Sequence, residues 1–330
     1  MNASVENRLA GLGICRIETV NPYSDVRTNC YFIDGAVPTL IDTALATEEA
    51  YGTICRELSQ RNRGIRDIKR IILTHGHADH RALAPRIVRE SGAAVFCHRS
   101  EAGKVVHTSP ELRALRHERS ERFFQSVGVP RELLPPLVDG PKSPYIKPRL
   151  DRVSFVDEGD EFAFDAFSFR VLHTPGHSCG SICLYDGDNN VLVTGDTLLP
   201  DPRITALLEF DILDDNPAYH GLKLHMGALE RLMSFGTPLS LPGHGEPFDG
   251  HQAIANEVFE RHQKRQRHIL RALRNGRRTP YQICRSVFPF LPPDDLYLAL
   301  SEIIGNMDVM EEEGRLIKRS EEDILWYEKA

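Results

Sequence analysis

A short run of histidine and aspartate residues constrains this chain more than any other feature of its sequence. Residues 74–80 read Thr-His-Gly-His-Ala-Asp-His, which places three imidazoles and one carboxylate within six residues. The run follows the apolar segment 71–73, which predicts a buried strand, and precedes a segment at 81–90 that predicts a helix. The four polar side chains therefore belong to a turn at the carboxyl end of a strand, where α/β proteins place their sites.

The spacing within this run indicates two points of attachment. His75 and His77 point the same way in extended geometry, because side chains alternate along a strand. Asp79 and His80 follow after the chain has turned, so they can face a second point. This arrangement suits two neighbouring metal ions better than one.

Composition and charge are those of an ordinary globular protein, with 330 residues, 41% hydrophobic and 26% charged. This length allows a large core and two domains. The formal net charge of −7 disfavours nucleic acid as an obligatory partner. We expect no membrane association, because no stretch approaches the roughly 20 apolar residues of a membrane span. Residues 1–11 lack the layout of a signal peptide, and the seven scattered cysteines form no CxxC pair, so we expect a reduced, cytoplasmic protein.

Apolar periodicity predicts two β-rich halves. In the first half we expect a helix at 46–60 and strands at 14–20, 30–33, 39–41, 71–73 and 93–97. Residues 99–150 break this rhythm with many prolines and a helix at 112–126. We interpret them as an inserted lid near the site, with surface decoration as the alternative. The second half begins near Val153, with a helix at 216–234 and strands at 161–164, 167–172, 181–185, 190–193 and 239–241.

The tail from residue 251 has a different layout. It predicts helices at 257–275, 280–287 and 293–313, and then two short strands at 315–318 and 324–327. Three helices followed by a small hairpin are typical of a winged helix. We therefore predict a catalytic domain at 1–250 and a smaller, winged-helix-like domain at 251–330.

Three later strand ends carry further residues of metal-ligand type. His177 lies in Thr-Pro-Gly-His-Ser, Asp196 in Thr-Gly-Asp-Thr and His244 in Pro-Gly-His-Gly. Each follows a short apolar run and has a neighbouring glycine, which lets the backbone approach closely. A single His or Asp in such a turn is usually a surface or capping residue. Five histidines and two aspartates at strand ends together favour a metal site.

These four segments, in this order and spacing, resemble the metallo-β-lactamase superfamily over residues 12–250. The resemblance implies an α/β fold, an αββα sandwich with a metal site along its upper edge. It also implies two metal positions joined by one carboxylate. The implied ligands are His75, His77 and His177 for the first metal, Asp79, His80 and His244 for the second, and Asp196 between them.

This ligand set predicts the chemistry of the site. Imidazoles and carboxylates suit zinc, with iron or manganese as alternatives. Two metal ions about 3.5–4 Å apart can share a hydroxide and polarise an electrophile. We therefore predict a dinuclear metal-dependent hydrolase whose bridging hydroxide attacks a thioester, lactone or ester in a small-molecule substrate. Asp79 is the expected catalytic residue, which orients the hydroxide and relays a proton.

Other residues near these motifs receive secondary roles. Asp42 resembles the superfamily's first-motif aspartate and is expected to hold a ligand histidine or the ligand loop; the alternative is an N-cap for the helix near residue 46. Cys179 is interpreted as structural, because the ligand set is full without it. Tyr219 and His220 are candidates for substrate contact. The histidines without a matched role are His98, His107, His173, His220 and His225.

The tail also resembles the C-terminal domain of a glyoxalase-II-like branch, some relatives of which cut single-stranded RNA. Eight basic residues and no acidic residue lie between Arg261 and Arg278, and such a stripe can follow a phosphate backbone. Nevertheless, 13 basic and 13 acidic residues balance from residue 251 onward, and no aromatic residues interleave with the basic ones. A single-strand-specific endoribonuclease is the alternative function, and iron-dependent redox chemistry is a third. We expect the tail to pack against the catalytic domain or to form a homodimer.

Overall fold

The computed structural model describes residues 3–23, 25–140, 143–201, 206–209, 221–236 and 238–330. These residues form two compact units, each assembled from separate stretches of the chain. Unit 1 takes its residues from 1–107, 143–204 and 228–255, and unit 2 from 108–142, 205–227 and 256–330. The boundary predicted at residue 250 separates two parts expected to fold independently. Division into compact units does not test independent folding, so this boundary stays a prediction.

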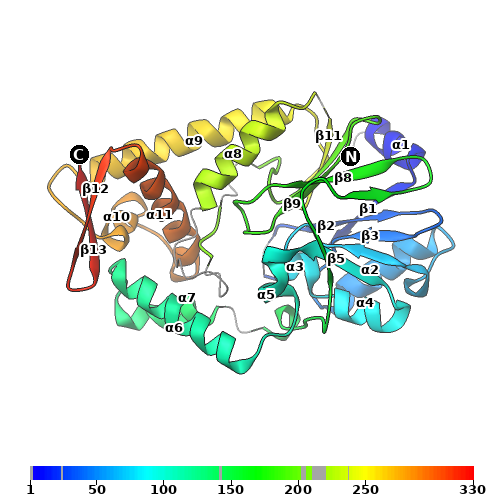
Figure 1. Cartoon of the computed structure of the whole chain (residues 1–330), viewed down its shortest axis with the longest axis horizontal. Helices are drawn as coiled ribbons and strands as arrows, with labels where there is room; N and C mark the ends of the chain where they lie inside the picture. Colours follow the sequence, from blue (N-terminus) through cyan, green and yellow to red (C-terminus); the bar gives the residue numbers. More distant parts are fainter. Residues whose placement is uncertain (1–2, 24, 141–142, 202–205, 210–220, 237) are drawn as a thin grey trace. The chain divides into compact units, whose positions relative to one another are not determined.

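Unit 1 contains two β-sheets (Figure 1). The first has the strand order β1-β2-β3-β4-β5-β6, and β3 to β6 run parallel. The second has the order β11-β10-β9-β8-β7 and is antiparallel except for β10 and β11. The strands are β1 Ile14–Thr19, β2 Thr28–Ile33, β3 Thr39–Ile41, β4 Arg70–Ile72, β5 Ala94–His98, β6 Ser154–Val156, β7 Glu161–Ala163, β8 Ser168–His173, β9 Ile182–Asp186, β10 Val191–Gly195 and β11 Leu239–Pro242.

The helices agree in broad terms with the sequence periodicity, and α8 and α9 each have residues in both units. None of the described helices is both long and apolar enough to cross a membrane. The α-helices are α1 Ala3–Gly11, α2 Glu48–Ser59, α3 Ala78–Arg81, α4 Ala84–Ser91, α5 Ala102–Val105, α6 Pro110–Ser126, α7 Leu134–Asp139, α8 Gly221–Met233, α9 His251–Ala272, α10 Pro280–Val287 and α11 Leu296–Glu312.

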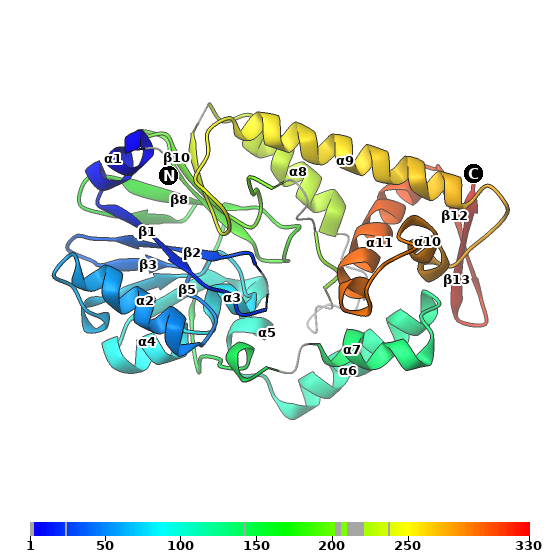
Figure 2. The ribbon, with the colours of Figure 1, turned by 180° about the vertical axis from the view of Figure 1, so that it is seen from behind.

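The two sheets of unit 1 pack face to face because their strands bury both faces. Ile71 of β4 packs in a core shared with α2 and α4, whereas the next residue, Ile72, packs in a core shared with Phe169 of the second sheet. Successive side chains of a strand point to opposite faces, so one apolar run serves both cores. On the outer face of the second sheet, Leu232 of α8 packs against Leu192. This layering, visible in Figure 2, confirms the predicted αββα sandwich.

Three sequence predictions differ from the structure. The second half was expected to begin near Val153, but β6 pairs with β5 and completes the first sheet. The helix predicted at 81–90 is split into α3 and α4, and α4 begins next to Pro85, which favours a helix start. The first helix of the tail, α9, begins at His251 rather than at 257. Of the helix predicted at 216–234, residues 216–220 lie outside the described residues.

Unit 2 contains most of α9, together with α10 and α11, α6 and α7 of the predicted insertion, and a hairpin of β12 Leu316–Glu321 and β13 Ile324–Lys329. Phe124 of α6 is fully buried in a core that includes Met307 of α11 and Tyr327 of β13. The hairpin turn uses Glu322 and Asp323, both with positive φ, which matches the twist of paired strands. The insertion therefore contributes to the same core as the tail, and the winged-helix comparison stays a prediction.

Candidate metal centre

All seven residues predicted as ligands lie together at one edge of unit 1. Each follows the carboxyl end of a strand, so the sheet geometry brings distant parts of the chain to one place. The potential ligand atoms of His75, His77 and His177 lie within 4.8 Å of one another. The same limit holds for a second group, which consists of Asp79, His80 and His244.

Asp196 lies between the two groups. Its Oδ2 is 3.5 Å from Nε2 of His177 in the first group and 3.2 Å from Nε2 of His244 in the second. Its Oδ1 is 3.5 Å from Nε2 of His80. One carboxylate therefore has an oxygen facing histidines of both groups.

The family model of the metallo-beta-lactamase superfamily matches residues 23–244. The chain belongs to this superfamily. It is 27% identical over 325 residues to "Probable metallo-hydrolase YqjP" of Bacillus subtilis, an alignment that covers 95% of this chain and 97% of that protein. The chain also matches the crystal structure of metallo-beta-lactamase family protein TTHA1429 from Thermus thermophilus, with 26% identity, a TM-score of 0.77, and coverage of 96% of this chain and 99% of that one.

Another relative, matched over a shorter stretch, carries a specific activity in its name. "Atrochrysone carboxyl ACP thioesterase" of Aspergillus fumigatus is 26% identical over 149 residues, which cover 42% of this chain and 43% of that protein. The full-length matches and the family model make this chain a metal-dependent hydrolase of the metallo-β-lactamase superfamily.

Glycine next to the ligands lets the superfamily's motifs come this close. Gly243 precedes His244, and a Cβ atom there would overlap Oδ1 of Asp196 and lie 2.8 Å from Cε1 of His80. Gly195 precedes Asp196 with φ +48°, and a Cβ there would lie 2.8 Å from Cβ of Thr74. Both positions combine close backbone approach with tight space, which is the physical reason for glycine in these turns.

Two buried atoms of the cluster have no hydrogen-bond partner among the described residues. They are Nε2 of His75 and Oδ1 of Asp196, on side chains that are 1% and 5% exposed. Buried polar atoms are nearly always satisfied, so two unsatisfied atoms in one cluster call for an explanation. A divalent cation bound by imidazole nitrogens and a carboxylate supplies one, and the donor set fits such an ion.

Burial and neighbouring charges shift the pKa values of His75 and Asp196 in the cluster. Burial, followed by the neighbouring imidazoles of His80 and His77, lowers the pKa of His75 well below its usual value, so this ring is neutral. Burial alone would raise the pKa of Asp196, but His244 and His80 outweigh it and hold that pKa well below its usual range. His75 and Asp196 thus have the protonation states that metal binding requires, whereas the nearby carboxylates raise the pKa of His80 and of His244, so those rings release a proton when a cation binds.

Asp42 lies outside the ligand groups and orients the ring of His80. Its side chain is buried, and Oδ2 lies 2.9 Å from Nδ1 of His80, which leaves Nε2 of that ring facing the other ligands. Thr74 donates to the same carboxylate through its backbone N–H at 2.7 Å and its hydroxyl at 2.6 Å. The alternative role as helix N-cap is wrong, because Thr47 caps α2 by accepting from the N–H of Ala50.

Several histidines and one cysteine lie outside the cluster. His98 and His173 stack with ring centroids 3.9 Å apart, and Nε2 of His173 contacts the carbonyl of Cys179 at 3.1 Å. Among the described residues, no candidate ligand group includes these three or His107 and His225. The two residues proposed to reach substrate, Tyr219 and His220, lie outside the described residues.

Sequence reasoning missed two buried charged residues that hold the ligand loops. Glu101 accepts hydrogen bonds from the loops on both sides of the first group, and Arg81 donates to the carbonyl of Gly76 at 2.9 Å. Arg81 directly follows the histidine run, so its position was a signal that could have been used. Glu101 stands alone at the start of the insertion, and nothing in the local sequence distinguishes it from a surface glutamate.

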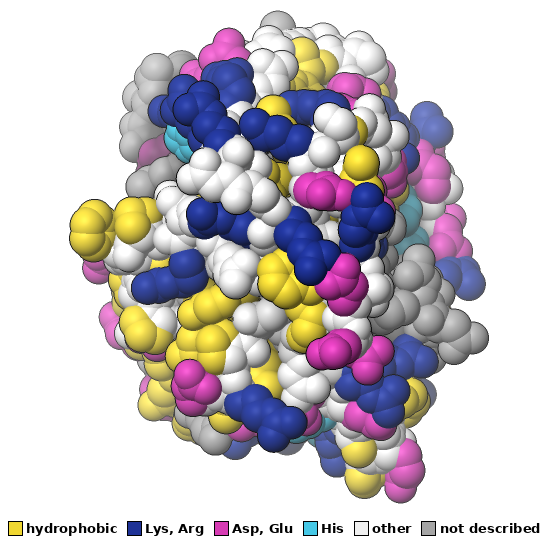
Figure 3. All heavy atoms as spheres, turned by 90° about the vertical axis from the view of Figure 1, so that its left-hand side faces the viewer, with side chains coloured by type: hydrophobic (Ala, Val, Ile, Leu, Met, Phe, Trp, Pro, Cys, Tyr) yellow, Lys and Arg dark blue, Asp and Glu magenta, His cyan; other side chains and the backbone are white. Residues whose placement is uncertain are grey.

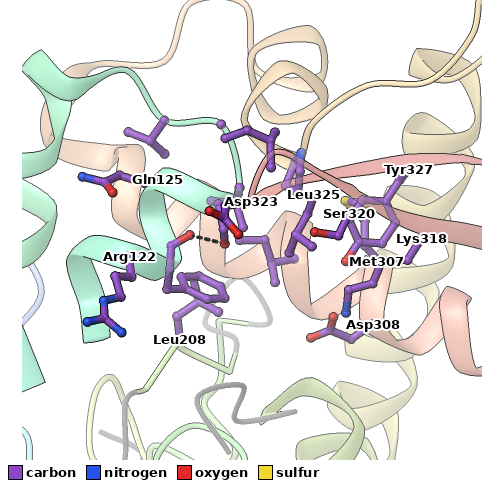
Figure 4. A pocket seen from close by; sticks show the side chains of 18 of the residues that line it. Arg122, Gln125, Leu208, Met307, Asp308, Lys318, Ser320, Asp323, Leu325 and Tyr327 are labelled. Atoms are coloured by element: carbon purple, nitrogen blue, oxygen red, sulfur yellow. Dashed lines mark hydrogen bonds between the residues drawn. The ribbon is translucent and has the colours of Figure 1, made fainter. Parts of the chain in front are cut away.

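Unit 2 contains a separate cavity of about 1280 Å³ between α6, α11 and the β12–β13 hairpin (Figure 4). Its apolar lining includes Met307 and Leu325, and its charged lining mixes both signs, with Arg122 and Lys318 beside Asp308 and Asp323. None of the seven clustered ligand candidates lines it. The cavity and the candidate metal centre are therefore distinct features of the molecule.

Proposed function

We propose that this superfamily member binds two divalent metal ions, zinc first among them, and hydrolyses ester-type bonds in a small-molecule substrate. The observation that carries the proposal is the position of Asp196, whose carboxylate faces both groups of three ligand candidates. A thioester is the preferred target, supported by the relative named as a thioesterase. A cytoplasmic location, a homodimer and the glyoxalase-II-like branch stay predictions.

In this proposal each group of residues has one task. Two bound metal ions would supply an activated water at neutral pH and polarise the scissile carbonyl. His75, His77 and His177 would hold the first ion. Asp79, His80 and His244 would hold the second, and Asp196 would contact both.

Asp79 is suited to proton transfer because its side chain is less buried than its neighbours. It is 22% exposed, whereas His80 is fully buried and Asp196 is 5% exposed. Its Oδ2 lies 3.4 Å from Nε2 of His244, within the second ligand group. A carboxylate at the solvent-facing side of the cluster can orient a water molecule and pass its proton to the leaving group.

Exposed apolar side chains near the cluster favour a substrate with an apolar part. The loop residues 20–23 and 25–27 are linked to the centre through the carbonyl of Arg27, which accepts from Nδ1 of His244 at 2.7 Å. This loop exposes Tyr23 and Val26, and the ring of Tyr145 lies 6.5 Å from that of Tyr23. We propose that these side chains contact the acyl or alcohol part of the substrate.

The basic residues of the tail support the endoribonuclease alternative less than their number suggests, because several of them are in ion pairs. Arg261 and Arg265 both pair with Glu302, and Arg277 pairs with Glu321. The face of unit 2 in Figure 3 shows Lys and Arg side chains interspersed with Asp and Glu. A paired arginine must give up its carboxylate partner before it can follow a phosphate backbone, so the basic segment is a poorer RNA track than a free stripe.

The test is one hydrolysis panel on zinc-loaded protein, with thioesters, lactones and esters beside a short single-stranded RNA. We expect turnover of carbonyl substrates that is lost on chelation and in Asp196→Asn. The matched control is Asp186→Asn, because Asp186 is also buried but accepts from the N–H groups of Asp188 and Asn189 at the opposite end of β10. RNA cleavage without carbonyl turnover would overturn the proposal.

A further inference from the structure

The loops that carry the three histidines of the first group meet on one carboxylate. The first loop contains His75 and His77 with Gly76 between them, and the second contains His177, followed by Ser178. Glu101 lies where a short helical turn passes into α5, and its side chain is fully buried. We infer that Glu101 is a positioning residue that fixes these two loops together and thereby sets the affinity of the first metal position.

The hydrogen bonds of Glu101 divide between the two loops. Oε2 accepts from the backbone N–H of Gly76 at 2.8 Å. Oε1 accepts from the backbone N–H of Gly180 at 2.6 Å and also from the hydroxyl of Ser178. One carboxylate therefore joins the loop before α3 to the loop after β8, and two of its partners, Gly76 and Ser178, are sequence neighbours of the histidines.

Both loops are shaped to receive this carboxylate. A Cβ atom on Gly76 would lie 2.5 Å from Oε2 of Glu101, and a Cβ on Gly180 would lie 2.9 Å from Oε1. A side chain at either position would push the loop away from the carboxylate. The two glycines and Glu101 therefore form one packing unit in which no member can change size independently.

Two basic side chains complete the arrangement. Lys104 lies one helical turn after Glu101, and its ammonium is 2.9 Å from Oε2, which balances the buried negative charge. Arg81 donates to the carbonyl of Gly76 at 2.9 Å and to that of Ile146 at 3.0 Å. Gly76 is thus bound through its N–H by an anion and through its carbonyl by a cation, so the two peptide groups that flank it, between His75 and His77, are each held in one orientation.

The second group of ligand candidates is held by different residues. Asp42 contacts the ring of His80, and the carbonyl of Arg27 accepts from the ring of His244. Asp42 reaches the first group only indirectly, through Thr74, whose hydroxyl lies 3.2 Å from Nδ1 of His75. No hydrogen bond described in the structure joins Glu101 to the ring of His80 or His244. Removing the Glu101 charge is therefore expected to act on the first metal position and to leave the second nearly unchanged.

This inference rests on the proposed two-metal function, and its test measures metal binding rather than turnover. In Glu101→Gln, one oxygen becomes an NH₂ group that cannot accept from an N–H, so one of the two loops loses its anchor. We expect one of two zinc dissociation constants, measured by competition with a chromophoric chelator, to rise about 10–100-fold. The other is expected to stay within about threefold, and the cobalt-loaded protein is expected to show an altered visible spectrum.

Three variants complete the test. Ser178→Ala removes one donor and is expected to weaken the same zinc site by a smaller factor, which keeps the inference testable if Glu101→Gln does not fold. Asp42→Asn is expected to weaken the second zinc site more than the first, because Asp42 contacts His80 directly and His75 only through Thr74. Asp186→Asn, the buried carboxylate at the far end of the sheet, is expected to change neither affinity.

The outcomes separate this inference from the proposed function. Unchanged zinc affinities in folded Glu101→Gln and Ser178→Ala would overturn the inference, as would equal weakening of both sites with a lower unfolding midpoint of the metal-free protein. A wild-type protein that binds two zinc ions but hydrolyses nothing would overturn the proposed activity and leave the inference intact. A wild type that binds no zinc would overturn both.

Discussion

Unit 1 and unit 2 both bury histidines, but they surround them with different charges. His80 of unit 1 is fully buried, yet the carboxylates of Asp196, Asp79 and Asp42 outweigh burial and raise its pKa well above the usual value. His262 of unit 2 is equally inaccessible. Burial, followed by His225 and Arg261, lowers its pKa to about 3.

The difference between these two histidines teaches what makes a buried imidazole part of a cation site. Both have little access to water, so burial does not distinguish them. The carboxylates around His80 supply negative charge that a cation can neutralise, whereas the neighbours of His262 are basic or neutral. The nearest polar partner of His262 is the amide of Asn306, at 3.2 Å from Nδ1. A histidine in such a place serves packing rather than metal binding.

The largest expected effect comes from removing the carboxylate that the two ligand groups share. Asp196→Asn keeps the shape of the side chain but removes its charge, so the two proposed cations would lose their common anion. We expect loss of metal from both positions and a fall in kcat/KM beyond the about 100-fold that outer-shell changes cause. Metal analysis of the purified variant checks this, and two bound metals with wild-type turnover would contradict it.

A smaller change in metal content is expected from His77→Ala, which removes one ligand of the first group. Turnover should be abolished, because the proposed chemistry needs two ions, while the second group is expected to keep its metal. Zinc content near one ion per chain, together with inactivity toward the substrate panel, is the predicted result. Full activity with normal zinc content would show that His77 is not a ligand.

Asp42→Asn tests how strongly a carboxylate outside the ligand groups, in contact with a ligand candidate, affects metal affinity. The amide keeps one oxygen, so it can accept at the Oδ1 position from the backbone N–H of Thr74 or at the Oδ2 position from the Thr74 hydroxyl and the His80 ring, but not at both. The negative charge beside the His80 ring is also lost. We expect the second zinc to bind about 10–100-fold more weakly. Chelator competition measures this, and Thr47→Ala, which removes the cap of α2 instead, is the control that should leave zinc affinity unchanged.

The smallest effect is expected for His262, and it concerns stability rather than activity. Its pKa is about 3 in the folded protein and about 6.5 when unfolded, so the unfolded state alone binds a proton between these values. Stability is therefore lost as the pH falls below about 6.5, by about 2 kcal/mol at pH 5. His262→Gln should be less sensitive to pH between 7 and 5 in denaturant unfolding, with unchanged kcat/KM at pH 7. An unchanged pH slope would remove His262 as the source.

Local sequence was sufficient to locate the candidate ligands, because each belongs to a short motif at a strand end. Asp196 and His244 lie far apart in the chain. Each was nevertheless identified as a candidate because it follows an apolar strand and has a neighbouring glycine. Glu101 could not be predicted in this way, since its role depends on two loops that meet it only in the folded protein. The same reason explains β6: three residues carry no signal for which sheet they join.

The insertion was recognised as a break in rhythm but not as a structural partner of the tail. Its helix α6 has charged residues on most of its surface, so the sequence alone gives little sign of what covers Phe124. The partners of that ring come from α11 and β13, more than a hundred residues later. Long-range packing of this kind is invisible to any reading of local periodicity.

Because unit 2 is assembled from three stretches of the chain, it cannot complete its fold during synthesis until the last stretch has been made. Residues 108–142 leave the ribosome early, but the core that buries Phe124 is completed only when β13 has been made. Until then an apolar segment stays uncovered in the nascent chain, which is the condition that favours misfolding and chaperone binding. A premature stop codon near residue 250 would therefore produce a chain that aggregates, however well its sheets had formed.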